Sequence, residues 1–161
     1  MKWNNHIKFL SSKLNKTYYM ISSLKNLMSP YVLRTMYFAC FHVHLRYGLT
    51  LWHGDPESIR ILRLRKKVLR IICKAGRHIS CRNIFKDLNI LPLLCLYINE
   101  AVCCVESNME MIKYEYNEKV HDHCKRQKSD LHTQICRTTL FKNSSANVVI
   151  KLYDKLPKTI K

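Results

Sequence analysis

A row of basic side chains between residues 57 and 74 is the pattern in this sequence best suited to binding. Five cations recur there at spacings of 3, 4, 3 and 4, which places them in one narrow arc of a helix. A solvated face is the usual explanation of a charge run. No acidic residue follows Glu57 in this stretch, however, so the repulsion is uncompensated, and this favours a polyanion as partner. The row, named the basic stripe, consists of Arg60, Arg63, Lys67, Arg70 and Lys74, with Lys66 flanking it.

The opposite side of this helix is apolar, so it can pack on a core while the stripe faces outwards. Arg65 is the cation that falls inside the apolar arc. At the start, Asp55 is predicted to be the N-cap, with Pro56 in the first helical position. At the end, Gly76 is predicted to supply the left-handed residue that terminates the helix.

A second group of residues has the chemistry of zinc ligands, since nitrogen and sulfur donors at short spacing can hold that metal. The chain has no C-x₂-C pair, and the C-x₇-H-x₃-C spacing from residue 124 is not a familiar one. We therefore interpret these residues as a solvated loop and predict no metal. The group comprises His121, His123, Cys124, His132 and Cys136, with Cys103 and Cys104 as additional candidates.

Catalytic patterns are missing from the sequence. Polymerases and nucleases hold Mg²⁺ with clustered carboxylates. This chain has no Asp-Asp pair, and only three acidic residues occur in positions 1–92. It also lacks a glycine-rich phosphate loop and a G-x-S-x-G elbow. We predict no catalytic residues and no cofactor, and expect that the chain on its own is not an enzyme.

Aromatic residues in the first third of the chain raise the alternative of base stacking. Aromatics at helical spacing usually belong to a core, which is the interpretation we prefer. Tyr47 and Trp52, beside the break that begins at Gly48, are predicted to be the exposed pair. The full set is Trp3, Tyr18, Tyr19, Tyr31, Tyr37, Tyr47 and Trp52.

The net charge of +17 is concentrated in the first part of the chain, where residues 1–92 hold 17 Lys and Arg against three acids. A nucleic-acid backbone explains this excess best, and an anionic membrane surface is the second choice. The N-terminus lacks the apolar core of a secretory signal, so we expect an intracellular protein of the nucleus or cytoplasm. The cysteines are then reduced, and those in apolar patterns are predicted to be buried, namely Cys40, Cys73, Cys95 and Cys103.

Apolar periodicity predicts a mainly α fold, a bundle of about five helices. The expected helices cover residues 5–28, 30–49, 57–74, 80–88 and 92–108. Beyond these the pattern fades, which predicts a helical domain at 1–110 and an irregular basic tail at 111–161 that folds back on the helices. The longest uncharged runs, 35–45 and 88–99, are too short to span a bilayer, so no membrane partner is expected.

Several short motifs occur in an order that resembles the C-terminal part of reverse transcriptases from non-LTR, LINE-type (jockey-like) retrotransposons. W-x₂-H-I at 3–7 and L-R-Y-G-L-x₂-W at 45–52 precede the basic helix, L-R-K-K-V-L-R-I-I at 64–72. S-C-R-N-I-F-K-D-L-N-I-L-P-L at 80–93 and L-Y-D-K-L-P-K-x-I-K at 152–161 follow it. One departure is the segment from His121 to Cys124, where the family often has a turn that contains tyrosine.

The resemblance implies a helical thumb and an adjoining segment that bind the template–primer duplex, an RNA–DNA hybrid or another duplex, without reading its sequence. The polymerase palm, with its Y-x-D-D box, would then precede Met1, and the chain would be a fragment that has the palm as a further partner. Loss of the palm would leave an apolar patch on the helix at 30–49 or 92–108. Alternatives are a decayed retroelement remnant and a helical protein-interaction domain.

Overall fold

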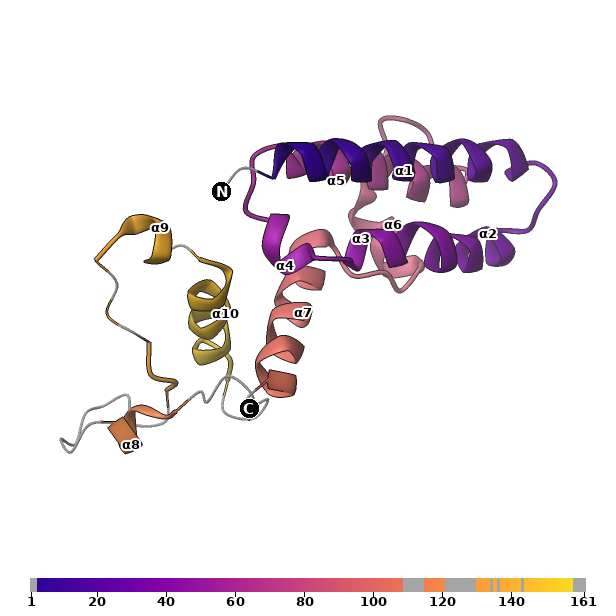
Figure 1. Ribbon diagram of the computed structural model, residues 1–161. Helices are drawn as coiled ribbons and strands as arrows, with labels where there is room; N and C mark the ends of the chain where they lie inside the picture. The colour runs from indigo at the N-terminus through magenta and orange to yellow at the C-terminus, as the bar shows by residue number, and fades with distance from the viewer. Residues whose placement is uncertain are drawn as a thin grey trace. The chain divides into compact units, whose positions relative to one another are not determined.

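The computed structural model in Figure 1 describes residues 3–108, 115–120, 130–133, 135, 137–142 and 144–157. The protein is mainly α-helical, as predicted. It divides into two units, Met1–Leu96 and Tyr97–Lys161, whereas the sequence pattern predicts a boundary at residue 110. The division falls within helix α7 (Leu93–Asn108), because Ala101 and Val105 already pack with the C-terminal helix.

The first unit contains four of the five predicted helices and the start of the fifth. The helix predicted at 30–49 consists of three consecutive elements. It begins as the α-helix α2, widens into the π-helix η1 and ends as the α-helix α3, with no break between them. A short extra helix, α4, lies in the predicted break after Gly48. The elements are α1 (Asn4–Leu24), α2 (Pro30–Met36), η1 (Tyr37–His42), α3 (Val43–Arg46), α4 (Leu49–Trp52), α5 (Ser58–Ile72) and α6 (Cys81–Asp87).

Helices α1 and α5 lie side by side and run in the same direction, and the α2–α3 segment returns antiparallel to α1 (Figure 1). The buried face of α1 repeats at helical intervals, as the periodicity predicts. Between the two helical segments, Pro30 occupies the first turn of α2, and the Ser29 hydroxyl accepts a hydrogen bond from the Val32 N–H. The core-facing residues of α1 are Ile7, Leu10, Leu14, Thr17 and Ile21.

Arg65 of α5 is completely buried in this unit. Its Nε donates to the Tyr37 hydroxyl at 2.8 Å, and its Nη2 donates to the backbone carbonyl of Leu91. The guanidinium carbon also lies 5.3 Å from the centre of the Phe85 ring. Burial raises the pKa of the Tyr37 phenol, and the charge of Arg65 opposes that rise. Arg65 thereby ties α5 to η1, to α6 and to the segment before α7.

Helix α5 ends at Ile72, and the left-handed residue that terminates it is Lys74 rather than Gly76, so the predicted terminator is wrong. Lys74 has a φ of 50°, and Gly76 has no positive φ. The Ala75 N–H donates to the Arg70 carbonyl at 2.8 Å and the Lys74 N–H to the Ile71 carbonyl at 3.1 Å. This is the Schellman pattern, in which the left-handed residue directly follows the C-cap. Because the C-cap is Cys73, the residue that adopts the left-handed conformation is Lys74.

The second unit contains α8 (Asn117–Val120), α9 (Thr139–Lys142) and α10 (Ser145–Asp154). The tail was predicted to be irregular, but α10 is a regular helix of 10 residues. Its apolar side packs on the second half of α7, and the Asp154 carboxylate accepts a hydrogen bond from the Leu131 N–H at 3.0 Å. The buried cluster consists of Ala101, Val105, Leu131, Val149, Ile150 and Tyr153.

The predicted burial of the cysteines is wrong for two of the four. Cys40 and Cys73 are partly buried, whereas Cys95 and Cys103 are exposed on α7. The apolar pattern of α7 is broad, so the sequence does not distinguish its buried face from its exposed one.

We expect Lys74→Gly to raise the free energy of unfolding by about 0.5–1 kcal/mol, because glycine adopts a positive φ without steric cost. Urea denaturation measures the change. Gly76→Ala is the control: a Cβ there would meet the Ile79 side chain at 3.8 Å, an ordinary contact, so stability should not fall. A less stable Lys74→Gly protein, or a loss in the control, would contradict this account of the helix end.

Tyr37→Phe should lower the free energy of unfolding by about 1–3 kcal/mol, because it leaves the buried Nε of Arg65 without its acceptor. The same substitution at the exposed Tyr31 should change stability by less than about 0.5 kcal/mol. Thermal or urea unfolding of both variants provides the comparison. Equal effects of the two would show that the Arg65–Tyr37 hydrogen bond does not stabilise the unit.

Candidate nucleic-acid interface

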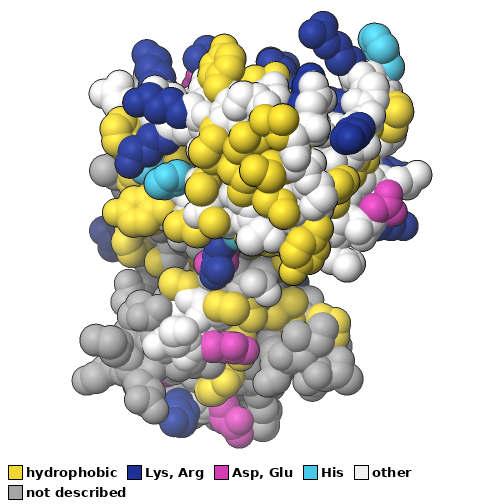
Figure 2. All heavy atoms as spheres, turned by 90° about the vertical axis from the view of Figure 1, so that its right-hand side faces the viewer, with side chains coloured by type: hydrophobic (Ala, Val, Ile, Leu, Met, Phe, Trp, Pro, Cys, Tyr) yellow, Lys and Arg dark blue, Asp and Glu magenta, His cyan; other side chains and the backbone are white. Residues whose placement is uncertain are grey.

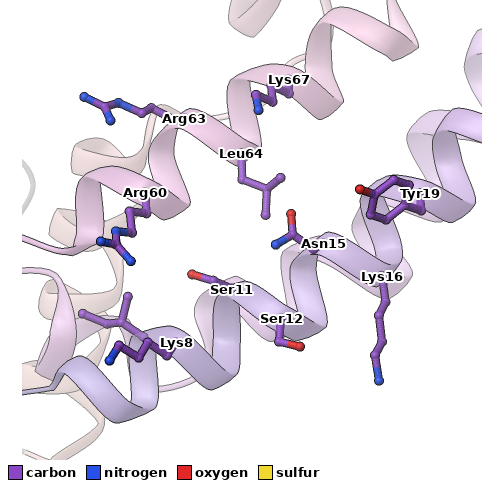
Figure 3. Close-up of a pocket in the computed structure, with 11 residues that line it drawn as sticks. Lys8, Ser11, Ser12, Asn15, Lys16, Tyr19, Arg60, Arg63, Leu64 and Lys67 are labelled. Atoms are coloured by element: carbon purple, nitrogen blue, oxygen red, sulfur yellow. The ribbon is translucent and has the colours of Figure 1, made fainter.

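A groove runs between α1 and α5 on the surface of the first unit. It consists of two hollows, of about 620 and 770 Å³, which share Lys67 as a lining residue. Figure 3 shows the first hollow, with α1 on one side and α5 on the other. The second hollow continues to the ends of the same helices, where Lys25 and Lys74 follow them. The two form one continuous groove along a parallel helix pair.

Cations from both helices line this groove. Nine Lys and Arg side chains contribute to it, and none of the other described residues that line it is acidic. Repulsion among these charges persists unless an anion lies between them. We name the surface the cationic groove, and its cations are Lys8, Lys16, Lys25, Arg60, Arg63, Lys67, Arg70, Lys74 and Arg77.

All five residues of the basic stripe line the cationic groove, but they are engaged differently. Arg63 and Lys67 are exposed on α5. Arg60 is also exposed, and its Nε lies 2.6 Å from the Glu57 carboxylate. The stripe residue Lys74 follows the helix instead of lying on it, as the early end of α5 requires. Arg63 and Lys67 are therefore the exposed stripe cations that lie on α5 itself and outside the Arg60–Glu57 ion pair.

Arg70 has a structural contact in addition to its place in the groove. It is partly buried, and its Nε and Nη2 donate to the Ile79 carbonyl at 3.2 and 3.1 Å. This contact holds the segment between α5 and α6. Lys66, the predicted flanking residue, is partly buried and does not line either hollow. The structure thus groups the five stripe residues and leaves Lys66 outside.

The α1 side of the groove was not anticipated from the sequence. Lys8 and Lys16 are eight residues apart and form no conspicuous run, so they join the stripe only through the packing of α1 on α5. Ser11 and Asn15 lie between these cations and point towards α5 in Figure 3. The sequence shows only that Ser11 and Asn15 fall outside the apolar repeat of α1, which does not indicate that α5 packs beside them.

One aspartate fixes the starts of both groove helices. Asp55 Oδ2 accepts a hydrogen bond from the Trp3 N–H at 3.1 Å, directly before α1. Its Oδ1 accepts from the Glu57 N–H at 3.0 Å, directly before α5. Helix α5 begins at Ser58, and its N-cap residue is Glu57, which makes no side-chain cap hydrogen bond. The prediction of Asp55 as N-cap and Pro56 as first helical residue is therefore wrong, because Asp55 accepts the Glu57 N–H one turn ahead of the helix. A carboxylate at two helix N-termini also has a favourable interaction with both helix dipoles.

The prediction that Tyr47 and Trp52 are both exposed is correct for Tyr47 only. The Tyr47 side chain is 76% exposed, but Trp52 is completely buried and its indole N–H donates to the Tyr47 carbonyl at 3.0 Å. Tyr19, which belongs to the aromatic set that the sequence assigned to the core, is instead 70% exposed and lines the cationic groove.

The residues considered as zinc ligands lie mostly outside the described residues, which leave out His121, His123, Cys124 and Cys136. Within the described part, no group of three or more potential metal-binding side chains occurs. Cys103 and Cys104 are exposed on α7. Likewise, no described helix combines the length and the apolar character that crossing a membrane requires.

Comparisons with protein-family models, with curated proteins and with solved structures find no match to this chain. The functional interpretation therefore depends on the geometry and charge of the site.

Asp55→Ala should lower the free energy of unfolding by about 1–2 kcal/mol, because two backbone N–H groups lose their acceptor. Asp87→Ala makes the same change in charge at the last residue of α6, where an acid opposes the helix dipole, and should be neutral or slightly stabilising. Circular dichroism during thermal unfolding compares the two. Equal losses would mean that Asp55 has no special role in joining α1 and α5.

Proposed function

We propose that the first unit binds the sugar–phosphate backbone of a nucleic acid in the cationic groove. The observation that carries the proposal is the gathering of nine cations from α1, α5 and the segments that directly follow them, with no acid among the described lining residues. The α5 side, from residue 60 to 74, extends over about 20 Å at the helical rise per residue. One strand presents roughly six phosphates over that length. The dimensions thus suit a backbone partner.

The groove supports backbone binding rather than base recognition. Contacts with phosphates set the position of a protein on a nucleic acid without reading its sequence. Arg63 and Lys67 carry their charges on long side chains at the surface, which suits such contacts. The partner in this proposal is an RNA–DNA hybrid or another nucleic acid, bound inside the cell in the nucleus or cytoplasm.

The resemblance to LINE-type reverse transcriptases gives this proposal a context. In a polymerase of that kind, the chain would bind the template–primer duplex for an RNA-directed DNA polymerase. The catalytic carboxylates would belong to a palm outside this chain. The absence of an Asp-Asp pair from the sequence agrees with a role in binding. The decayed-remnant alternative predicts instead that no nucleic acid binds at physiological salt.

A protein-interaction domain is the second candidate, and an apolar patch favours it. Figure 2 looks onto the end of the first unit where α1 turns into α2, and it shows hydrophobic side chains gathered there with Lys and Arg around them. Leu27 is 78% exposed in this turn. Two of the residues lie on α2, one of the helices on which loss of a palm was expected to leave such a patch. The exposed apolar residues of the turn are Leu27, Met28, Tyr31 and Val32.

Replacing Arg63 and Lys67 together by Gln should weaken binding about equally for unrelated sequences. It should also reduce the slope of log affinity against log salt by roughly 1.4–1.8, since each lost phosphate contact removes 0.7–0.9. Fluorescence anisotropy at several salt concentrations measures both quantities with an RNA–DNA hybrid, duplex DNA and single strands.

The matched control is Arg82→Gln with Lys86→Gln on α6, which removes the same charge from exposed residues outside the groove. Its salt slope should stay within about 0.3 of the wild type, since no phosphate contact is lost. Identical slopes for the two double variants would show that net charge, and not the cationic groove, attracts the nucleic acid. Lack of binding by the wild type at physiological salt would refute the proposal.

A further inference from the structure

Tyr19 is an aromatic ring in an otherwise polar and cationic row of α1. Ser11, Asn15 and Tyr19 follow one another at intervals of four residues, so they lie on the same face of the helix. Figure 3 shows this row facing the groove, with Tyr19 at one end of it. With 70% of its surface exposed, Tyr19 contributes little to the core. Such exposure leaves the face of the ring available to a ligand.

Neighbouring contacts hold the tyrosine in place. The rings of Tyr18 and Tyr19 meet edge to face, with centroids 5.5 Å apart. Tyr18 itself lines the second hollow, so the pair stands where the two hollows meet at Lys67. Cations of both groove sides therefore flank an exposed ring. A positive groove that contains an aromatic platform is the arrangement with which proteins bind single strands.

The width of the helix pair also favours one strand. Packed helices have axes about 8–10 Å apart, and each is about 10–12 Å across, so the pair measures about 20 Å. A major groove about 12 Å wide admits one helix but not two. Helices α1 and α5 therefore cannot enter a duplex groove together. A single backbone can lie along the cationic groove instead, and in a single strand the bases are unpaired and can turn towards α1.

We infer that the cationic groove takes single-stranded nucleic acid and that Tyr19 stacks on one of its bases. This inference rests on the proposed function and names its substrate class. Phosphates lie along Arg63 and Lys67 on the α5 side, while a base covers the exposed ring of Tyr19 on the α1 side. Every base has a π face, so this contact adds affinity without sequence preference.

The test compares strands of equal charge with and without bases. The probes are single strands of about 12 nucleotides, as DNA and as RNA of one sequence, the DNA annealed to its complement, and an abasic strand of the same length. The wild type should bind both single strands more tightly than the abasic strand and the duplex. Tyr19→Ala should lower affinity for the base-containing strands roughly tenfold and leave the abasic affinity and the salt slope unchanged.

Two variants control for folding and for nonspecific effects. Tyr19→Phe keeps the ring and should retain the affinity of the wild type. Tyr31→Ala removes a tyrosine that is 76% exposed but does not line the groove, and it should have no effect on any probe.

Two results would overturn the inference while leaving backbone binding in place. They are an unchanged affinity of Tyr19→Ala for base-containing strands, and tighter binding of the duplex than of either single strand by the wild type. Loss of abasic binding in Tyr19→Ala would also count against it, because the residue would then act through the fold and not through stacking. Failure of the wild type to bind any probe would refute the proposed function itself.

Discussion

The buried guanidinium of Arg65 is the constraint on which the first unit depends. A charge without water is costly unless its hydrogen bonds are made elsewhere, and here a phenol and a carbonyl from two other segments make them. No carboxylate takes part in these contacts. The Nη1 atom has no hydrogen-bond partner among the described residues. Loss of either remaining hydrogen bond would therefore leave the buried guanidinium poorly compensated. Any rotation of α5 about its axis would break both hydrogen bonds.

Fixing the rotation of α5 also fixes the direction of its charged side. Arg65 points inwards together with Ile61 and Val68, both fully buried, while Arg63 and Lys67 are exposed. Asp55 adds a second constraint, because its two oxygens join the backbone just before α1 to the backbone just before α5. The rotation and the start of α5 are thus both set by polar contacts. The cationic groove results from these two contacts and from apolar packing between the helices.

The helices of the first unit were predictable because each one repeats its apolar residues over several turns, as Leu10, Leu14 and Ile21 do in α1. Helix ends were less predictable. Both Lys74 and Gly76 stand near the end of α5, and the left-handed residue is Lys74, although glycine has the greater preference for that conformation. The stripe was visible because it lies on one helix. Lys16 and Tyr19 belong to the same site only through the packing of α1 on α5, and no local pattern records that contact.

Packing two cationic helices together costs electrostatic free energy. That cost is small compared with the free energy gained when apolar side chains between the helices are buried. At 10 Å in water, two unit charges repel by about 0.4 kcal/mol before screening by salt. Burying one leucine or isoleucine side chain contributes about 1.5–3 kcal/mol. The fully buried Leu14, Ile21 and Ile61 therefore offset many such pairs. An anion in the groove would remove the repulsion and stabilise the folded state by mass action, which couples binding to the packing of α1 on α5.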